Sequence, residues 1–508
     1  MKKYLLLIII TLLFSLVFAE SINVKTINDL ASNQQISNDS LFTLLANWQN
    51  YSQPQKTDVF LLEHNQVNDT LAAPYVVYIP KGYDINKKTP LIIYLHGGVS
   101  TKVFHDTPLE YAEQNYFTRY AKENNWIVVY PMGNNDTAWW NLAGINNLKA
   151  QIRKLKSQYN IDDDKIYISG FSDGGSGSYH LALNAPDDFA AFYPLNGMIS
   201  VGSIVTEIPV FLPNFRNRYV YAINTDEDGL YPAKKMRNFI KLSMEADANL
   251  YYKEYWGFGH TFEYADNELP IIFENMKTKI RDIFQPEIYW ETATLDYGKC
   301  DWIQITAIDT LLTKKEWQKE YNIEISDERV SFGFYNDREY EDYGTRISKI
   351  MEGSAAETMG LKENDIIIKM DGIEAENIGE LIKLRSKKKR GDNFTLTVLH
   401  DDNETQLSGQ FPEVTHYNAL NYSKPSAAVN AIYYGNHFNI ETSRVSKIAL
   451  YVHPKMINLD IPIVVTINGK EVLNKMVGID REFMIQNFIE NFDKKALWVN
   501  KIILNINE

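Results

Sequence analysis

Residues 165–175 read Lys-Ile-Tyr-Ile-Ser-Gly-Phe-Ser-Asp-Gly-Gly, a short apolar run that leads into a serine flanked by glycines. The run 165–169 is typical of a strand, and the sequence predicts a helix over 178–184. A serine on such a sharp strand-to-helix turn is held clear of the sheet, and small flanking residues permit the turn. The segment therefore predicts a nucleophile elbow at Ser172; the alternative is a glycine-rich turn without chemistry.

Five further apolar runs lie on either side of this segment and alternate with helical stretches: 75–79, 91–95, 126–130, 219–223 and 250–255. Strands that alternate with helices indicate a largely parallel sheet with helices on both faces. The runs contain almost no polar positions, as expected of strands that are buried on both sides. We therefore predict an α/β domain over residues 59–285.

A serine nucleophile needs a base within hydrogen-bond reach and a carboxylate that orients the base. His260 follows the run 250–255, and Asp226 and Asp228 both follow the run 219–223. Taken singly, each is more readily a loop histidine or a solvated acidic turn. Together they give the order nucleophile, acid, histidine, which is one established order of a catalytic triad. Spacing does not choose between the two aspartates.

Acyl transfer also requires two donors aimed at the developing oxyanion. Residues 95–98, Leu-His-Gly-Gly, follow the run 91–95, and we expect the backbone N–H groups of Gly98 and Asp173 to be these donors. Trp139 and Trp140 follow another run. They either line a substrate pocket or serve as ordinary packing, and the sequence favours neither. It contains no metal-ligand cluster, so we predict no metal and no cofactor.

The N-terminus predicts export. Two lysines precede an uncharged apolar run over 4–18, and small residues near Ala19 fit cleavage of a signal peptide, residues 1–19. A retained anchor is the alternative, but the run is shorter than the roughly 20 residues of a spanning helix. We therefore expect a secreted or periplasmic protein. Cys300 is the single cysteine, so the chain folds without an internal disulfide.

The length and the charge of the chain limit the number of domains and the kinds of partner that it can have. A chain of 508 residues should contain about three domains. The net charge of -14 argues against nucleic acid or an anionic membrane as the main partner. Residues 20–58 predict a helical lead-in. Beyond 285 the alternation of helix and strand stops, and residues 286–320 and 413–508 predict one split β-sandwich-like domain, into which residues 321–412 are inserted.

Residues 74–284 resemble the esterase and prolyl-oligopeptidase-like branch of the α/β-hydrolases, which includes acetylxylan esterases, feruloyl esterases and polyhydroxyalkanoate depolymerases. The segments that carry the resemblance are 75–83 (YVVYIPKGY), 90–98 (PLIIYLHGG), 159–172 and 259–261 (GHT). In this family residues 230–232, Leu-Tyr-Pro, would follow the triad acid, so the resemblance favours Asp228. The chain departs from the family at 224–226, where a glycine is usual.

This resemblance implies that Ser172 forms an acyl-enzyme with a carboxylic ester, such as an acylated polysaccharide or a polyester. One alternative is a peptidase of the same branch. Another is a binding protein on a hydrolase scaffold that no longer turns over.

Residues 331–407 resemble PDZ domains of bacterial exported proteases. Residues 331–334 (SFGF) stand where the carboxylate-binding loop would be, and 353–367 together with 371–372 repeat the family's central signature. The resemblance implies that a peptide or a protein C-terminus adds to a sheet edge at Phe332, Gly333 and Phe334. The acidic segment 337–342 would repel a C-terminal carboxylate, so a structural spacer is the alternative.

Overall fold

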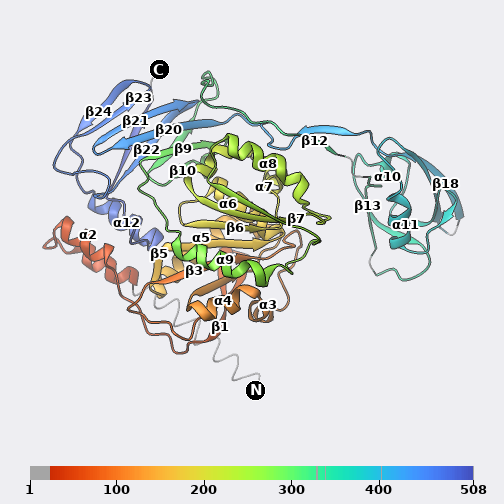
Figure 1. Ribbon diagram of the computed structural model, residues 1–508, viewed down its shortest axis with the longest axis horizontal. Coiled ribbons are helices and arrows are strands. Elements are labelled where there is room, and N and C mark those ends of the chain that lie inside the picture. Colours follow the sequence, from red (N-terminus) through yellow and green to blue (C-terminus); the bar gives the residue numbers. More distant parts are fainter. Residues whose placement is uncertain (1–22, 328–329, 338, 402, 507–508) are drawn as a thin grey trace. The chain divides into compact units, whose positions relative to one another are not determined.

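The computed structural model describes residues 23–327, 330–337, 339–401 and 403–506 (Figure 1). The predicted signal peptide, 1–19, lies outside these residues. The chain divides into two compact units: unit 1 comprises Met1–Tyr321 and Leu420–Glu508, and unit 2 comprises Asn322–Ala419. No helix among the described residues combines the length and the apolar character needed to cross a membrane.

An eight-stranded sheet forms the centre of unit 1. Its strands are β1 (Val59–Asn68), β2 (Leu71–Ile79), β3 (Thr89–Leu95), β4 (Ile127–Pro131), β5 (Ile161–Phe171), β6 (Ala191–Leu195), β7 (Tyr219–Thr225) and β8 (Leu250–Tyr255). They lie in the order β1-β2-β4-β3-β5-β6-β7-β8. The strands from β4 to β8 pair in parallel, whereas β1 and β2 pair antiparallel. This mostly parallel sheet confirms the predicted fold class.

Helices cover both faces of the sheet (Figure 1). They are α3 (Pro108–Gln114), α4 (Tyr116–Asn124), α5 (Leu142–Gln158), α6 (Asp173–Asn184), α7 (Val201–Thr206), α8 (Ala233–Glu245) and α9 (Ala265–Thr278). One core joins α3, α4 and α9 to alternate residues of the strands, such as Val76 and Tyr78. Lys154 of α5 lies over the ring of Tyr75, which points to the opposite face. Because both faces are covered, the central strands β3, β4 and β6 are apolar and buried along nearly their whole length, whereas the edge strands β1 and β8 include polar residues.

The second part of unit 1 contains two further sheets. One has the order β10-β11-β22-β25 and the other the order β24-β23-β21-β20-β9. Their strands are β9 (Glu287–Thr292), β10 (Lys299–Cys300), β11 (Ile303–Ile308), β20 (Ala427–Tyr434), β21 (His437–Ser443), β22 (Val445–Val452), β23 (Ile463–Ile467), β24 (Lys470–Lys475) and β25 (Asn500–Asn505). Helices α2 (Asn38–Ala46) and α12 (Arg481–Asn491) pack on the same apolar core as these strands.

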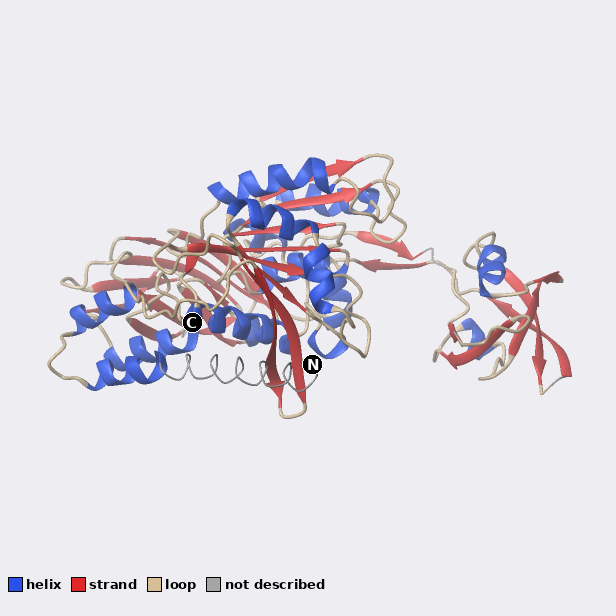
Figure 2. Cartoon of the chain, turned by 90° about the horizontal axis from the view of Figure 1, so that it is seen from below, coloured by secondary structure: helices blue, strands red, loops and turns tan. Residues whose placement is uncertain are grey.

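Unit 2 is a small β-rich body with two short helices (Figure 2). Its main sheet has the order β13-β14-β15-β17-β18, with β16 beside β15, and β12 and β19 form a separate pair. The elements are β12 (Glu324–Asp327), β13 (Phe334–Asn336), β14 (Thr345–Ile350), α10 (Ala355–Thr358), β15 (Ile366–Met370), β16 (Ile373–Glu374), α11 (Ile378–Arg385), β17 (Asn393–His400), β18 (Asn403–Gln410) and β19 (Thr415–Asn418). It has an apolar core of its own, which includes Phe332, Ile347 and Phe394.

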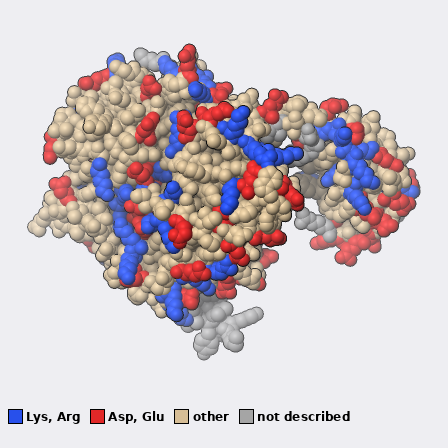
Figure 3. Space-filling model, viewed as in Figure 1, with Lys and Arg blue, Asp and Glu red and all other residues tan. Residues whose placement is uncertain are grey.

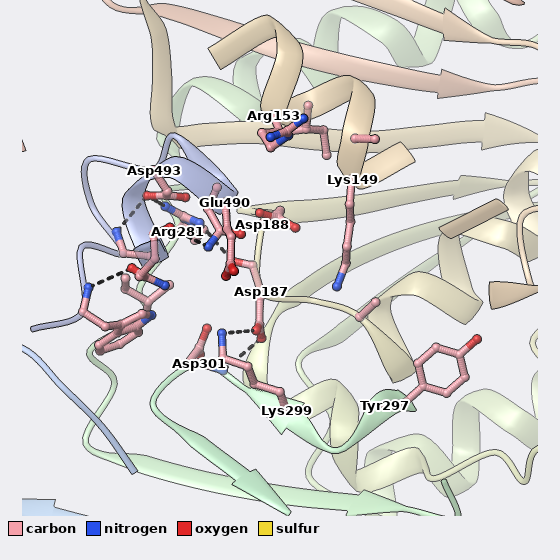
Figure 4. A pocket seen from close by; sticks show the side chains of 18 of the residues that line it. Lys149, Arg153, Asp187, Asp188, Arg281, Tyr297, Lys299, Asp301, Glu490 and Asp493 are labelled. Carbon is pink, nitrogen blue, oxygen red and sulfur yellow. Dashed lines mark hydrogen bonds and ion pairs between the residues drawn. The ribbon is translucent and has the colours of Figure 1, made fainter. Parts of the chain in front are cut away.

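A charged cavity of about 370 Å³ lies inside unit 1, between α5, the segment before β6, the segment around β10 and α12 (Figure 4). Arg281 and Asp493 pair at one wall, at 2.9 Å, and Lys299 reaches Asp187 at another, also at 2.9 Å. The cavity therefore marks the junction between the large sheet's layer and the β-rich part. Ser172 is not among its lining residues.

Burial of histidines such as His180 and His453 should make the stability of unit 1 depend on pH. Burial lowers the pKa of His180 to about 4, and burial together with Lys455 and Lys495 lowers the pKa of His453 to about 3. The unfolded chain keeps a histidine pKa near 6.5, so between these values it binds more protons than the folded chain. The neutral buried histidines therefore do not reduce the unfolding free energy above pH 6.5. As the pH falls toward 3, the unfolded chain takes up protons first, and the unfolding free energy decreases.

We therefore expect the unfolding free energy of unit 1 to fall as the pH falls from 7 to 4.5. The variant His453→Asn keeps an acceptor for the Lys455 N–H, which His453 Nδ1 binds at 3.0 Å. Because this variant removes one titrating group, the unfolding free energy should fall less steeply with pH than in the wild type. The difference in slope should be up to about 1.4 kcal/mol per pH unit, which corresponds to one bound proton. Urea unfolding at a series of pH values measures it. An unchanged slope would contradict the assignment.

Candidate active site

The backbone at Ser172 has the strained geometry that the sequence predicts for a nucleophile elbow. Its φ is 61° and its ψ is -121°, between the end of β5 and the start of α6. Positions 170 and 174 require glycine because the backbone approaches them closely. A Cβ on Gly174 would lie 1.9 Å from the Leu95 carbonyl oxygen, and a Cβ on Gly170 would lie 2.6 Å from the Gly174 backbone. A non-glycine residue with positive φ in a sheet-to-helix turn is held there by its surroundings.

The structure brings Ser172, His260 and Asp228 together at the carboxyl ends of β5, β7 and β8. His260 Nε2 lies 2.9 Å from Ser172 Oγ, and His260 Nδ1 lies 2.7 Å from Asp228 Oδ2. An ionised carboxylate only accepts hydrogen bonds, so Nδ1 carries the proton and Nε2 is free to accept one from the serine. Asp226 does not join this chain, because its Oδ1 accepts the Gly257 N–H at 2.7 Å.

Asp228 is buried, with a side-chain exposure of 0%. Burial by itself would raise its pKa, but hydrogen bonds from His260, Asn196 and the backbone N–H groups of Tyr231 and Leu230 outweigh burial and lower the pKa to about 2. The carboxylate is therefore ionised at neutral pH. It can hold the imidazole in one orientation and stabilise its charged form.

Asn196 is a site residue that the sequence analysis missed. It is fully buried, with φ at 44°, and its Nδ2 donates to Asp228 Oδ2 at 2.9 Å and to Thr225 Oγ1 at 2.6 Å. Tyr264 in turn donates its hydroxyl proton to Asn196 Oδ1 at 2.6 Å. This relay fixes the carboxylate from behind. Asn196 directly follows β6, and its position at a strand end was the signal that could have identified it.

The loop 96–99 lies against Ser172, as expected of an oxyanion loop. A Cβ on Gly97 would be 2.9 Å from Ser172 Cβ, and Gly98 has a φ of 70°. His96 Nε2 accepts the Gly133 N–H at 2.8 Å, so its Nδ1 carries the proton and donates to the Gly97 carbonyl at 2.7 Å. Burial lowers the pKa of His96, which keeps this ring neutral. The peptide between Gly97 and Gly98 is thus held in one orientation.

The side chain of Asp173 connects three loops of the site. Its Oδ2 accepts the Val99 N–H at 3.1 Å, and its Oδ1 accepts the Tyr231 hydroxyl at 3.0 Å. Tyr231 also donates its N–H to Asp228 Oδ1 at 2.8 Å. As the first residue of α6, Asp173 has a backbone N–H without a partner in its own helix. That N–H is thereby available to an anion beside Ser172.

Both tryptophans suggested as pocket walls are buried. Trp139 is 1% exposed and Trp140 is 3% exposed. Trp139 donates its Nε1–H to the His96 carbonyl at 2.9 Å, and its ring fills the space that a Cβ on Gly133 or Gly177 would need. Trp139 therefore packs beneath the oxyanion loop, and this contact favours the packing alternative for it.

The loop suggested for peptide binding lies in unit 2. Phe332 is buried in the core of that unit, where its ring stacks on Phe334. Gly333 has a φ of 83° and donates its N–H to Ser331 Oγ at 3.2 Å. Within the described parts of the chain, no group of three or more His, Cys, Asp or Glu side chains could hold a metal ion.

Comparisons with known proteins match two segments of the chain to families. Residues 73–202 match the Esterase family model, and residues 328–409 match the PDZ domain model. The first segment contains residues 96–99 and Ser172.

Individual relatives are distant. The bifunctional acetylxylan esterase/xylanase XynS20E of Neocallimastix patriciarum is 27% identical over 217 residues, 37% of this chain and 31% of that protein. A protein of Aspergillus oryzae named "Probable feruloyl esterase C" is 30% identical over 142 residues, 27% of this chain and 50% of that protein. The chain thus spans a third to a half of the length of these relatives.

Among solved structures, a thermostable esterase matches with a TM-score of 0.37 and 23% sequence identity, over 44% of this chain and 63% of that chain. The matched families, together with the sheet order above, settle the fold of each part. Residues 73–202 match the Esterase family model and residues 328–409 match the PDZ domain model, and the mostly parallel sheet of unit 1 is that of an α/β-hydrolase fold.

Proposed function

We propose that unit 1 hydrolyses carboxylic esters through an acyl-enzyme on Ser172. The observation that supports this most is the continuous hydrogen-bonded chain from Ser172 Oγ through His260 to the buried carboxylate of Asp228. Few structural roles require a strained serine, a histidine and an ionised buried carboxylate in line. The relatives with ester-hydrolase names point to the same chemistry.

In the first half-reaction His260 Nε2 takes the proton of Ser172 as Oγ attacks the ester carbonyl. The N–H groups of Gly98 and Asp173 stabilise the oxyanion, each contributing about 3 kcal/mol. The tetrahedral intermediate then expels the alcohol, which receives the proton from His260. In the second half-reaction water gives a proton to His260 and attacks the acyl group, and the acid leaves as Ser172 regains its proton.

A fluorophosphonate probe tests this assignment, because it phosphonylates only an activated serine. We expect stoichiometric labelling of the wild-type chain and none of Ser172→Ala. Ser178→Ala is the matched control: its hydroxyl is buried in α6 and donates to the Gly174 carbonyl, so labelling should persist. Equal labelling of wild type and Ser172→Ala would refute the proposal, and so would absence of labelling in wild type.

We further propose that the acyl donor is an ester rather than an amide, of the kind found in acylated polysaccharides, and that the protein acts outside the cytoplasm. p-Nitrophenyl acetate should be hydrolysed at least a hundredfold faster than a matched p-nitroanilide peptide at equal concentration. A preference for the anilide would instead support the peptidase alternative. Absence of turnover on both would support the non-catalytic alternative.

A second function is proposed for unit 2, since residues 328–409 match the PDZ domain model. We propose that it binds an extended peptide by adding it to the edge of β13, where main-chain hydrogen bonds provide affinity and side-chain pockets provide selectivity.

A further inference from the structure

The edge strand β13 is open on one side. In the main sheet of unit 2, as far as its residues are described, β13 pairs only with β14. The carbonyls of Gly333 and Tyr335 point toward β14. The Gly333 carbonyl accepts the Met351 N–H at 2.9 Å, and the Tyr335 carbonyl accepts the Ser348 hydroxyl at 3.1 Å. Backbone groups of alternate residues point to opposite sides. Those of Phe334 and Asn336 therefore face the open edge and can receive an added strand.

Helix α11 runs along this open edge in the opposite direction to β13. The guanidinium carbon of Arg385, at its C-terminal end, lies 5.9 Å from the centre of the Phe332 ring. Ile378, at its N-terminal end, lines one hollow together with Asn336, at the end of β13. Residues at positions i, i+4 and i+7 share a helix face, so Ile382, which is 43% exposed, also faces the groove. The strip between β13 and α11, called the groove below, thus has the apolar side chain of Ile382 beside it, the hollow at Asn336 at one end and the Arg385–Phe332 contact at the other.

The end of the groove near Phe332 is basic. Figure 3 shows lysine and arginine side chains gathered over the part of unit 2 that contains α11. Lys383, Arg385, Lys387 and Lys389 belong to the last turn of α11 and the segment after it. No ion pair joins any of these four to a carboxylate within the described residues. Arg385, which lies over the Phe332 ring, therefore brings to this end a positive charge that has no ion-pair partner among the described residues.

The opposite end of the groove is acidic. A hollow of about 580 Å³ there is lined by Glu341, Asp342 and Glu376. Arg346 also lines it, but this residue pairs with Asp337 at both Nε and Nη2. Among the side chains that the structure describes, none forms an ion pair with the other three carboxylates. Glu341, Asp342 and Glu376 thus lie at the far end of the groove from Phe332, away from a carboxylate bound beside Phe332.

We propose that the PDZ domain selects a peptide of polarised charge: a free C-terminal carboxylate with an acidic residue beside it, and lysine or arginine about four to six positions upstream. The carboxylate lies at the Phe332 end near Arg385, and the chain runs antiparallel to β13. At about 3.3 Å per residue, the upstream positions reach the acidic hollow. This inference rests on the peptide-binding function proposed above and extends it to the class of ligand.

Two fluorescein-labelled eight-residue peptides test the proposal with the full-length protein. Both end in valine with a free carboxylate. The polarised peptide has glutamate next to the valine and two lysines four and five positions upstream of the valine, and the reversed peptide has these charges exchanged. By fluorescence anisotropy, we expect the polarised peptide to bind at least tenfold more tightly than the reversed one. Its affinity should fall as salt is raised.

Charge-reversal variants locate the effect. Arg385→Glu should lower the affinity for the polarised peptide about tenfold. The double variant Glu341→Lys/Asp342→Lys should lower this affinity by the same factor and should raise the affinity for the reversed peptide. Glu404→Lys, exposed on β18 at the other edge of the sheet, is the matched control and should change neither affinity.

The outcomes separate the two proposals. Equal binding of both peptides, or no loss in Arg385→Glu, would overturn charge selection but leave peptide binding intact. Failure of both peptides to bind would overturn peptide binding as well. Esterase activity measured on the same samples shows that unit 1 is folded in either case.

Discussion

Asp228→Asn is expected to lower kcat for p-nitrophenyl acetate about 10⁴-fold and to leave KM nearly unchanged. The reason lies in which atoms of the carboxylate are already occupied. Asp228 Oδ1 accepts the N–H groups of Leu230 and Tyr231, both at 2.8 Å. In the amide, the oxygen must remain at that position, because two backbone donors point at it.

The amide nitrogen then stands at the Oδ2 position, 2.7 Å from His260 Nδ1. It donates a proton there, so the imidazole must carry its own proton on Nε2. This tautomer cannot accept the proton of Ser172. The nitrogen also faces the Asn196 amide group, a second donor, which adds strain without removing any side-chain volume.

Asp226→Asn is the matched control for this prediction. The two aspartates follow the same strand, but the Asp226 side chain accepts the Gly257 N–H, and an asparagine oxygen can still do so. We expect its kcat to stay within about threefold of wild type. Equal losses in both variants would show a general disturbance of the loop, and a loss confined to Asp226→Asn would make Asp226 the orienting acid.

The contrast between Asp228 and Asn196 shows what could be predicted of the site. Ser172, His260 and the aspartates Asp226 and Asp228 follow three apolar runs, so the positions of the runs predict that a serine, a histidine and an acid meet at one edge of the sheet. The choice of Asp228 over Asp226 came from the family resemblance. Asn196 follows β6, and no strand was predicted there. The run 191–195 contains Pro194, and a proline argues against a central strand because it has no N–H to donate. Here Pro194 stands near the end of β6, between β5 and β7.

In the β-rich part of unit 1, local sequence patterns predict a turn but not which distant strands pair. Asn468 and Gly469 predict a tight hairpin, and β23 and β24 form it, with φ of 50° and 79° at the two turn residues. The parallel pairing of β21 with β23 could not be predicted, because their connection contains no helix and no local pattern specifies which strands meet. Side-chain partners across such contacts depend on the assembled fold.

The ion cluster beside the charged cavity is a further feature that local patterns do not reveal, and it leads to the largest stability effect we expect. Lys156 on α5 lies 2.6 Å from Asp493 and 3.1 Å from Asp163, and Arg281 lies 2.9 Å from Asp493. All four side chains are at most 4% exposed. Burial would raise the pKa of Asp493, but Arg281 and Lys156 hold the pKa well below its usual value. Two buried cations are therefore matched by two carboxylates.

Asp493→Asn removes one of these carboxylates and should lower the unfolding free energy of unit 1 by about 3–5 kcal/mol, because a buried cation is left without its counter-charge. Urea unfolding at pH 7.5 measures the loss. Glu490→Gln, an exposed carboxylate lining the same cavity, should change it by less than about 0.5 kcal/mol.

The double variant Asp493→Asn/Lys156→Met removes one charge of each sign, so it should regain part of the stability lost in the single variant. Recovery would attribute the loss to the unmatched charge. If the double variant is no more stable than Asp493→Asn, the loss arises instead from the backbone N–H groups of Lys495 and Ala496, which Asp493 Oδ1 accepts at 3.0 and 2.7 Å. If Asp493→Asn costs less than 1 kcal/mol, the cluster does not hold the two layers of unit 1 together by charge.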